Sequence, residues 1–528
     1  MQRPAHGTLT IAESSYGRLK LFDNLAAANH SDSMLTNLAA QMIGPEGDVA
    51  KDGSDDEENP YVPAGYTYLG QFVDHDLTFD TLSVFDDPLS FEHASNLRTP
   101  RFDLDNIYGR GPDDQPYLYK DPFDGTLLLG EPLANGVPDV LRNRDGRAII
   151  GDPRNDENSI VVQVQSAFIR FHNRMIQRAN AGVDGKKLSG TDAFLWAQTQ
   201  TRRHYQRILL DDFLPRVIDP THSTVSSIFS DLQLGRAPKL KLYDLDRSAY
   251  IPVEFGVAAY RFGHSMIRPG YRLSVADNVE PLTPGLTGPD NISLFNVFEG
   301  DVGGLRGFQR LSPNKAINWS LFFFKGLAAG SQLANDNGSS NNQKGLRRTQ
   351  LSYKIDTMLV HPLGILPKAV SGDPSAANPS SLPERNLRRG REFGLPSGQD
   401  AAARVGAPIL PDERLSVRGD GSFSLGQRKT LTSIDPGFAG NAPLWFYILA
   451  EAEQGVIDGL ASGPSKEPLD LGTRLGPLGS AIVLETFVGL MLKDSESVLN
   501  PRAAWRSING KPTFSMEELF AEIETPLD

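Results

Sequence analysis

Apolar side chains recur at helical spacing in several stretches of this chain, and strand-like alternation is rare. Residues 161–175 show the pattern best, with apolar positions three or four residues apart. These positions are Val161, Val164, Phe168, Phe171 and Met175. We expect a second helix after Thr191, a third beginning near Pro252, and a fourth that contains residues 70–77. The pattern therefore predicts a mainly α fold with long ordered loops and little strand.

The segments between these helices are rich in turn-forming residues. The chain has 50 Gly and 37 Pro, which cluster between the periodic stretches, and no internal repeat is visible. Residues 44–60 are acidic and turn-rich, which predicts a solvated loop. Residues 331–345 and 371–383 are polar without periodicity, so we expect loops or lids there.

Composition excludes several classes of partner and chemistry. The net charge of -13 provides no basic field for nucleic acid or for an anionic membrane. The absence of cysteine excludes disulfides, a thiolate nucleophile and thiolate metal ligands. Any metal must therefore be held by histidine, carboxylate or main-chain oxygen.

Neither a signal peptide nor a membrane span is evident. Residues 1–15 lack the apolar core of a signal peptide. The longest apolar stretch, residues 479–492, is interrupted by Glu485 and is shorter than the roughly 18 residues of a membrane span. We therefore expect a cytoplasmic protein, or one exported by a leaderless route, and no membrane span.

The segment YLGQFVDHDLTFD (68–80) combines helix-forming spacing with chemistry. Gln71, Asp74 and His75 stand at i, i+3 and i+4, so a helix places them on one face. Asp76 is about 100° further round and must address something else. On this segment alone, a solvated helix surface is the alternative interpretation.

The segment RTPRFDLDNIYG (98–109) carries four residues at alternate positions, three of which have side-chain oxygen atoms. They are Thr99, Arg101, Asp103 and Asp105. An extended loop with this spacing can direct oxygen atoms to one hard cation such as calcium. An ordinary Asp-rich turn is the alternative.

GQFVDHD (70–76) resembles the distal-helix signature of the animal-type haem peroxidases, the peroxidase–cyclooxygenase superfamily. The resemblance implies that His75 is the distal acid-base residue and that Gln71 hydrogen-bonds the distal water or halide. It implies that Asp74 forms an ester with a haem methyl group and that Asp76 binds calcium. Residues 98–109 are similar to the family's calcium loop, with Thr99, Arg101 (through its carbonyl), Asp103 and Asp105 as ligands.

GDPRNDENSI (151–160) is similar to the family's Arg-x-x-Glu segment. The resemblance makes Arg154 the catalytic arginine and Glu157 the second ester-forming carboxylate. Asn158 stands where the halide-oxidising branch has a methionine bonded to a haem vinyl group. A sulfonium link is therefore ruled out, and the case for chloride as a substrate is weaker.

EFGVAAYRFGHSMIRP (254–269) resembles the proximal helix of the family, which makes His264 the ligand of the haem iron. Arg261, one turn earlier, would meet a haem propionate. ERNLRRGREFGLP (384–396) resembles the segment in which Asn386 accepts the N–H of the proximal imidazole and Arg389 supports a propionate. Taken alone, a histidine on an apolar helix such as His264 is more often a satisfied core residue than a metal ligand.

Together these resemblances imply a catalytic domain over residues 61–528, with residues 1–60 as an N-terminal extension and acidic loop packed on it. They imply haem b, ester-linked through Asp74 and Glu157, and a calcium ion. The implied reaction reduces hydrogen peroxide through compound I and oxidises iodide, thiocyanate, bromide or phenolic donors. A role in the response to oxidative stress and a monomeric state are further expectations.

Two other functions are considered from the same sequence. A fatty-acid dioxygenase or cyclooxygenase carries a radical tyrosine three residues before the proximal histidine, where this chain has Arg261 and places Tyr260 one position earlier. A non-catalytic adhesion protein would lack catalytic residues or carry extra modules, and neither is seen. A calcium-binding solenoid or a hydrolase would need repeats or a motif such as G-x-S-x-G, which are absent.

Overall fold

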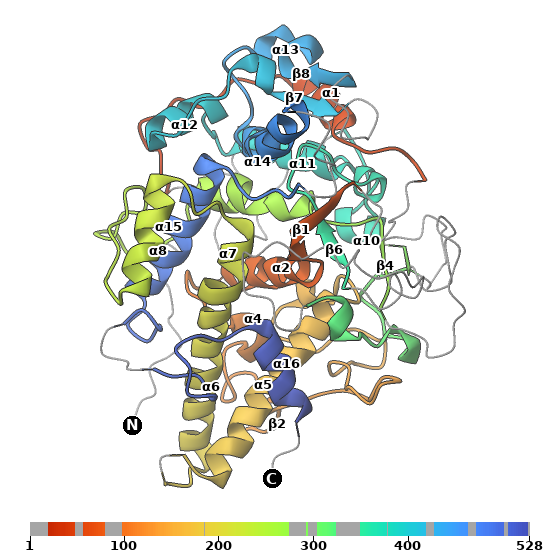
Figure 1. Ribbon diagram of the computed structural model, residues 1–528. Helices are drawn as coiled ribbons and strands as arrows, with labels where there is room; N and C mark the ends of the chain where they lie inside the picture. The colour runs from red at the N-terminus through yellow and green to blue at the C-terminus, as the bar shows by residue number, and fades with distance from the viewer. Residues whose placement is uncertain are drawn as a thin grey trace, which may run out of the picture.

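The computed structural model describes residues 19–47, 56–79, 98–183, 185–273, 292–293, 304–323, 349–376, 378–418, 427–462, 471–500 and 505–525. The protein is mainly helical, as predicted (Figure 1). Its α-helices are α1 (Asp32–Gln41), α2 (Gly65–Leu77), α4 (Asp105–Tyr108), α5 (Val161–Ala181), α6 (Gly190–Ile208), α7 (Leu214–Val217), α8 (Ser223–Gln233), α10 (Lys368–Ser371), α11 (Leu382–Glu392), α12 (Gly398–Val405), α13 (Leu431–Ile434), α14 (Leu444–Ala461), α15 (Pro477–Lys493) and α16 (Met516–Glu524).

In the described part of the chain, short 3-10 and π turns and four two-stranded sheets connect these helices. The turns are η1 (Pro116–Leu118), η2 (Pro153–Asp156), η3 (Leu209–Phe213), η4 (Glu254–Ala258), η5 (Ala259–His264), η6 (Pro313–Lys315), η7 (Trp319–Leu321), η9 (His361–Gly364), η10 (Asp412–Arg414) and η12 (Pro436–Phe438). The strands pair antiparallel as β1 (Glu58–Pro63) with β6 (Leu351–Tyr353), β2 (Tyr119–Asp121) with β3 (Thr126–Leu127), β4 (Gly270–Tyr271) with β5 (Ile292–Ser293), and β7 (Ser416–Arg418) with β8 (Arg428–Thr430).

Helix α2 crosses the middle of the molecule, with α5 and α6 below it in Figure 1 and α14 and the β7–β8 hairpin above. The predicted apolar stripe of α5 is buried, and it packs on both α2 and α6. Phe72 of α2 stacks on Phe168 of α5 with ring centroids 4.9 Å apart. Tyr205 of α6 meets both rings edge-on. This aromatic contact fixes the position of α2 relative to α5.

Three local predictions differ from the structure. Helix α6 begins at Gly190 with Ser189 as its N-cap, so Thr191 lies inside the helix. The predicted acidic loop 44–60 ends in strand β1, where Glu58 and Asn59 are buried. The segment after Pro252 forms a π turn followed by a 3-10 turn, because Ala258 leaves helical geometry at φ -129° and ψ -70°.

Three further predictions concern a polar segment, membrane-spanning helices and the domain boundary. Residues 331–345 lie outside the described residues. Within the described part of the chain, no helix combines the length and the apolar character needed to cross a membrane. The boundary at residue 60 between an extension and a catalytic domain stays a prediction, although β1 runs across it.

Candidate haem cavity

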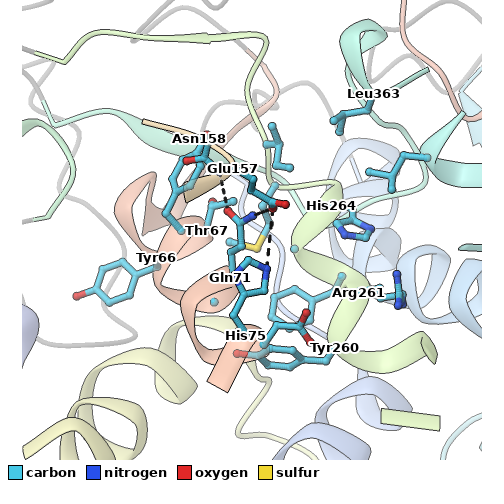
Figure 2. Close-up of a pocket in the computed structure, with 18 of the residues that line it drawn as sticks. Tyr66, Thr67, Gln71, His75, Glu157, Asn158, Tyr260, Arg261, His264 and Leu363 are labelled. Atoms are coloured by element: carbon cyan, nitrogen blue, oxygen red, sulfur yellow. Dashed lines mark hydrogen bonds and ion pairs between the residues drawn. The ribbon is translucent and has the colours of Figure 1, made fainter. Parts of the chain in front are cut away.

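A cavity of about 210 Å³ lies between α2 and the turn η5. It is lined by predicted residues from both sequence constellations, namely Gln71, Asp74, His75, Glu157, Arg261 and His264. Figure 2 shows the two imidazoles among its lining side chains, His75 from α2 and His264 from η5. The structure thus brings together two histidines that are far apart in the sequence.

His75 is buried, and each of its two ring nitrogens has a polar neighbour. Its Nδ1 atom lies 2.7 Å from Oδ1 of Asn155, and its Nε2 atom lies 3.9 Å from Oε1 of Glu157. Burial lowers the pKa of His75 to about 4, and the positive charge of Arg154 adds to this effect. His75 is therefore neutral at physiological pH and can accept a proton.

Gln71 is fixed by two partners at the end of its side chain. Its Nε2 donates to Glu157, and its Oε1 accepts from Nδ2 of Asn158 at 3.0 Å. Oδ1 of Asn158 accepts the N–H groups of Ile160 and Val161 at the start of α5. Asn158 therefore orients Gln71 and also satisfies two main-chain N–H groups where α5 begins (Figure 2).

Glu157 and Asp74 face the same cavity from two different elements. Burial raises the pKa of Glu157 to about 7, and the positive charge of Arg154 opposes this shift. Oδ1 of Asp74 accepts a hydrogen bond from Thr78 at 3.1 Å. Both carboxyl groups are thus available to a group bound in the cavity.

Arg154 occupies a different place from the one its predicted role requires. Its Nη2 donates to the carbonyl oxygens of His75, at 3.1 Å, and of Thr78, and it pairs with Asp152 at 2.8 Å. Among the described residues, the lining of the cavity does not include Arg154. The carboxylate of Asp152 and the carbonyl groups at the end of α2 hold its guanidinium behind His75.

On the other wall, His264 is buried, and burial lowers its pKa to about 3, with the charge of Arg261 as a second cause. Asn386 contacts it, as predicted, but with the opposite polarity. Nδ2 of Asn386 lies 2.7 Å from Nδ1 of His264, while its Oδ1 accepts from Nη1 of Arg261 at 2.9 Å. An imidazole that binds metal through Nε2 carries its proton on Nδ1. When the proton is on Nδ1, the side-chain amide of Asn386 must turn so that its oxygen accepts from His264. The hydrogen bond from Arg261 to that oxygen is then lost.

Tyr260 also lines the cavity, although helical spacing placed it about 100° from Arg261. Its ring stacks on Phe255 with centroids 4.7 Å apart. Its hydroxyl is buried and has no hydrogen-bond partner among the described residues. Burial raises the pKa of Tyr260 well above its ordinary value, so the phenol is neutral.

Arg389 is half-buried on α11 and does not belong to the described lining of the cavity. Arg385, one helical turn earlier, interacts electrostatically with Arg261 on the His264 side of the cavity. Burial lowers its pKa, and the like charge of Arg261 lowers it further. Two guanidinium groups that repel each other favour an anion between them, and the sequence patterns did not single out Arg385.

Of the predicted calcium ligands, Asp76 of α2 interacts with Asp103 and Asp105, to which Thr99 donates hydrogen bonds. Both carboxylate oxygens of Asp76 are buried, beside the main chain of Leu104 and the side chain of Tyr205. Burial raises its pKa well above the ordinary value, and the charges of Asp103 and Asp105 raise it further. Oγ1 of Thr99 donates to Asp103 at 2.7 Å and to Asp105 at 3.3 Å. Within the described residues, however, no three histidine or acidic side chains already converge as a metal-binding group.

The residues present fit a haem group. Two neutral imidazoles face one cavity, and apolar side chains complete its walls, among them Phe213, Met266, Leu363 and Leu366. Carboxyl groups stand on the His75 side and a guanidinium on the His264 side. Neutral imidazole nitrogen is a standard haem ligand, and apolar walls suit the porphyrin ring.

Comparisons with known proteins agree with this geometry. The sequence model of the animal haem peroxidase family matches residues 83–300, which include the segments of Glu157 and His264 and begin after α2. Peroxidase A from Dictyostelium discoideum superposes with a TM-score of 0.53 over 97% of this chain and 92% of that chain, at 15% identity. Residues 83–300 are thus similar to the animal haem peroxidase family, and the fold is similar to that of peroxidase A.

Individual relatives are distant. A peroxidase-like protein of Margaritifera margaritifera is 26% identical over 326 residues, which cover 48% of this chain and 37% of that protein. Peroxinectin A of Dictyostelium discoideum is 24% identical over 32% of this chain and 29% of its own length. The chain thus spans between 29% and 37% of the length of these two relatives. The rice fatty acid alpha-dioxygenase has the same fold, with a TM-score of 0.58 at 13% identity over 95% of this chain and 81% of its own.

Proposed function

We propose that the protein is a haem-dependent peroxidase that reduces hydrogen peroxide and oxidises small anions such as iodide, thiocyanate and bromide, or phenols. The observation that carries this proposal is the neutral, buried His75, which faces the same cavity as His264. Haem, when bound there, supplies the redox-active iron that peroxide oxidises. His264 would hold the iron, Arg261 a propionate, and Asp74 and Glu157 ester bonds to the ring.

In this proposal, His75 moves the proton of the substrate. Its Nε2 takes the proton from one oxygen of hydrogen peroxide and returns it to the other oxygen, which leaves as water. Gln71, whose amide is held by Glu157 and Asn158, orients the peroxide or the anion in the cavity. Arg154 acts through His75, because its positive charge behind the imidazole opposes protonation before peroxide arrives.

We also propose that calcium binds on the outer side of α2, at Asp76, Thr99, the carbonyl of Arg101, Asp103 and Asp105. The support is the buried carboxyl group of Asp76, because a carboxylate buried beside other acidic groups is costly unless a cation compensates its charge. The acidic side chains of Asp103 and Asp105 stand close enough to repel it. A divalent cation would remove this repulsion and hold the loop against the helix that carries His75.

The peroxidase proposal is tested by His75→Ala in haem-loaded protein. We expect the rate of the peroxide-induced change in haem absorbance to fall about 10²- to 10⁴-fold, the usual contribution of a general acid-base group. His361→Ala, a histidine on a partly exposed turn, should keep the native rate. A native rate in His75→Ala would exclude the proposed role.

A fatty-acid dioxygenase is the second candidate, and Tyr260 is the observation that favours it. Tyr260 lines the cavity, and its buried hydroxyl has no hydrogen-bond partner among the described residues, so its phenol is a candidate for oxidation. The discriminating measurement is oxygen uptake with a polyunsaturated fatty acid and no added peroxide. Uptake that is lost in Tyr260→Phe would favour the dioxygenase, and absence of uptake favours the peroxidase.

A further inference from the structure

Behind His75, a series of buried amide groups runs from the imidazole to the main chain. Nδ1 of His75 lies 2.7 Å from Oδ1 of Asn155. Nδ2 of Asn155 donates to Oε1 of Gln165 at 2.8 Å, and Nε2 of Gln165 donates to the carbonyl oxygen of Asn106 at 2.9 Å. Asn155, Gln165 and Asn106 are all fully buried. They come from η2, α5 and α4, so three elements support one ring of α2.

The polarity of this series is fixed at its far end. A main-chain carbonyl can only accept a hydrogen bond, so Gln165 must present its NH₂ group to Asn106 and its oxygen to Asn155. Asn155 must then present its NH₂ group to Gln165 and its oxygen to His75. Reversing either amide would place two donors or two acceptors against each other in a buried site.

We infer that Asn155 and Gln165 are positioning residues that keep the proton of neutral His75 on Nδ1. The lone pair of the ring is then on Nε2, the nitrogen on the Glu157 side that faces the cavity. The opposite tautomer would leave the oxygen of Asn155 facing a ring nitrogen without a proton. The chain thus specifies which nitrogen of His75 acts as the base.

The catalytic consequence rests on the proposed function, because only a peroxidase needs this base. A ring with its lone pair on Nε2 can take a proton from peroxide at once. A ring with its proton on Nε2 cannot take that proton. Loss of the amide series of Asn155 and Gln165, called the relay below, should therefore slow the peroxide reaction although His75 is still present.

The tautomer can be measured without haem. In protein labelled with ¹⁵N-histidine, the nitrogen shifts and long-range proton couplings identify which ring nitrogen carries the proton, and His75→Gln assigns the signal. We expect the wild-type ring to be protonated on Nδ1. Protonation of wild-type His75 on Nε2 would overturn the inference, whatever the variants do.

Substitutions of the two amides test whether their hydrogen bonds determine the tautomer of His75. Asn155→Leu and Gln165→Met keep side-chain size but break the relay, and we expect both to give mixed tautomers. Gln163→Met is the matched control. Gln163 is equally buried on α5, but its amide bonds Ser159, Lys315 and Ile317 instead. We expect it to keep the Nδ1 tautomer, and a single Nδ1 tautomer in both relay variants would overturn the inference.

Kinetics of haem-loaded protein provide the second readout. We expect the peroxide reaction of Asn155→Leu to slow about 10- to 100-fold, a part of the general acid-base contribution, and that of Gln163→Met to be unchanged. If wild-type protein does not react with peroxide, the proposed function fails, and the tautomer spectrum still tests the relay. An unchanged rate in Asn155→Leu with a mixed tautomer would contradict the catalytic consequence.

Discussion

Burial acts on the two titratable groups nearest each other in the cavity in opposite directions. It lowers the pKa of His75 to about 4, because the imidazolium loses hydration, and raises that of Glu157 to about 7, because the carboxylate does. Nε2 of His75 and Oε1 of Glu157 lie 3.9 Å apart. Around neutral pH the imidazole is therefore the free base, while the carboxyl is close to its titration point.

The lowered pKa of His75 predicts the pH dependence of the peroxide reaction. A depressed pKa keeps His75 unprotonated down to about pH 4, so the rate should stay level from pH 8 to about 5 and fall as pH 4 is approached. Stopped-flow pH jumps on haem-loaded protein measure it. An acid limb centred near 6.5, the ordinary imidazole value, would contradict the buried environment. In Glu157→Gln the limb should remain, which assigns it to His75.

Helix α2 carries residues of the cavity on one face and a candidate calcium ligand on the other. Gln71, Asp74 and His75 face the cavity, whereas Asp76 turns to the loop that contains Asp103. One residue of helical rotation thus moves a carboxylate from the cofactor side to the candidate cation side. Phe72, stacked on Phe168 of α5, keeps the helix in this rotation.

The outer face predicts calcium-dependent stability. Calcium at 100-fold above its Kd should raise the free energy of unfolding by about 2.7 kcal/mol, and a chelator should remove this increment. Asp76→Ala should abolish the increment, and Asp114→Ala, an exposed aspartate, should keep it. Thermal unfolding with and without calcium measures the difference. An equal increment in Asp76→Ala would place the ion elsewhere.

The inner face predicts covalent retention of haem. After turnover with peroxide, haem should remain with the chain in denaturing electrophoresis, because Asp74 and Glu157 face the cavity from α2 and from the residue after η2. Asp74→Asn and Glu157→Gln should each weaken the haem-stained band, and the double variant should lose it. Wild-type protein never exposed to peroxide is the control. A full band in the double variant would exclude both esters.

Sequence patterns predicted which residues of α2 share the cavity, since helical spacing converts directly into a face. They also predicted the helix 161–175, whose stripe is buried in α5. They could not predict the partner of His75, because Asn155 is distant in sequence and no local pattern records the contact. The position of the Arg154 guanidinium and the orientation of the Asn386 amide could not be predicted from the sequence for the same reason. Both depend on which of several acceptors the folded chain brings closest.

At the scale of the whole molecule, the fold joins sequence-distant segments around one cavity. A buried charge cluster supports the proximal side, where Arg418 of β7 pairs with Glu57 and Asp356. The main-chain N–H of Asp356 faces Oγ of Ser265, the residue after His264, at 3.4 Å. The N-terminal strand region, the β7–β8 hairpin and the proximal turn are therefore held as one unit, and α2 supplies the other wall.

The most direct test of this account is a haem titration of the purified protein followed by its visible spectrum. We expect one haem per chain in wild-type protein, with the spectrum of an imidazole-ligated iron. His264→Ala should lose that spectrum, and added imidazole should restore it by filling the space of the missing ring. His361→Ala should match wild-type protein. An unaltered spectrum and affinity in His264→Ala would contradict the assignment of the cavity as a haem site held by His264.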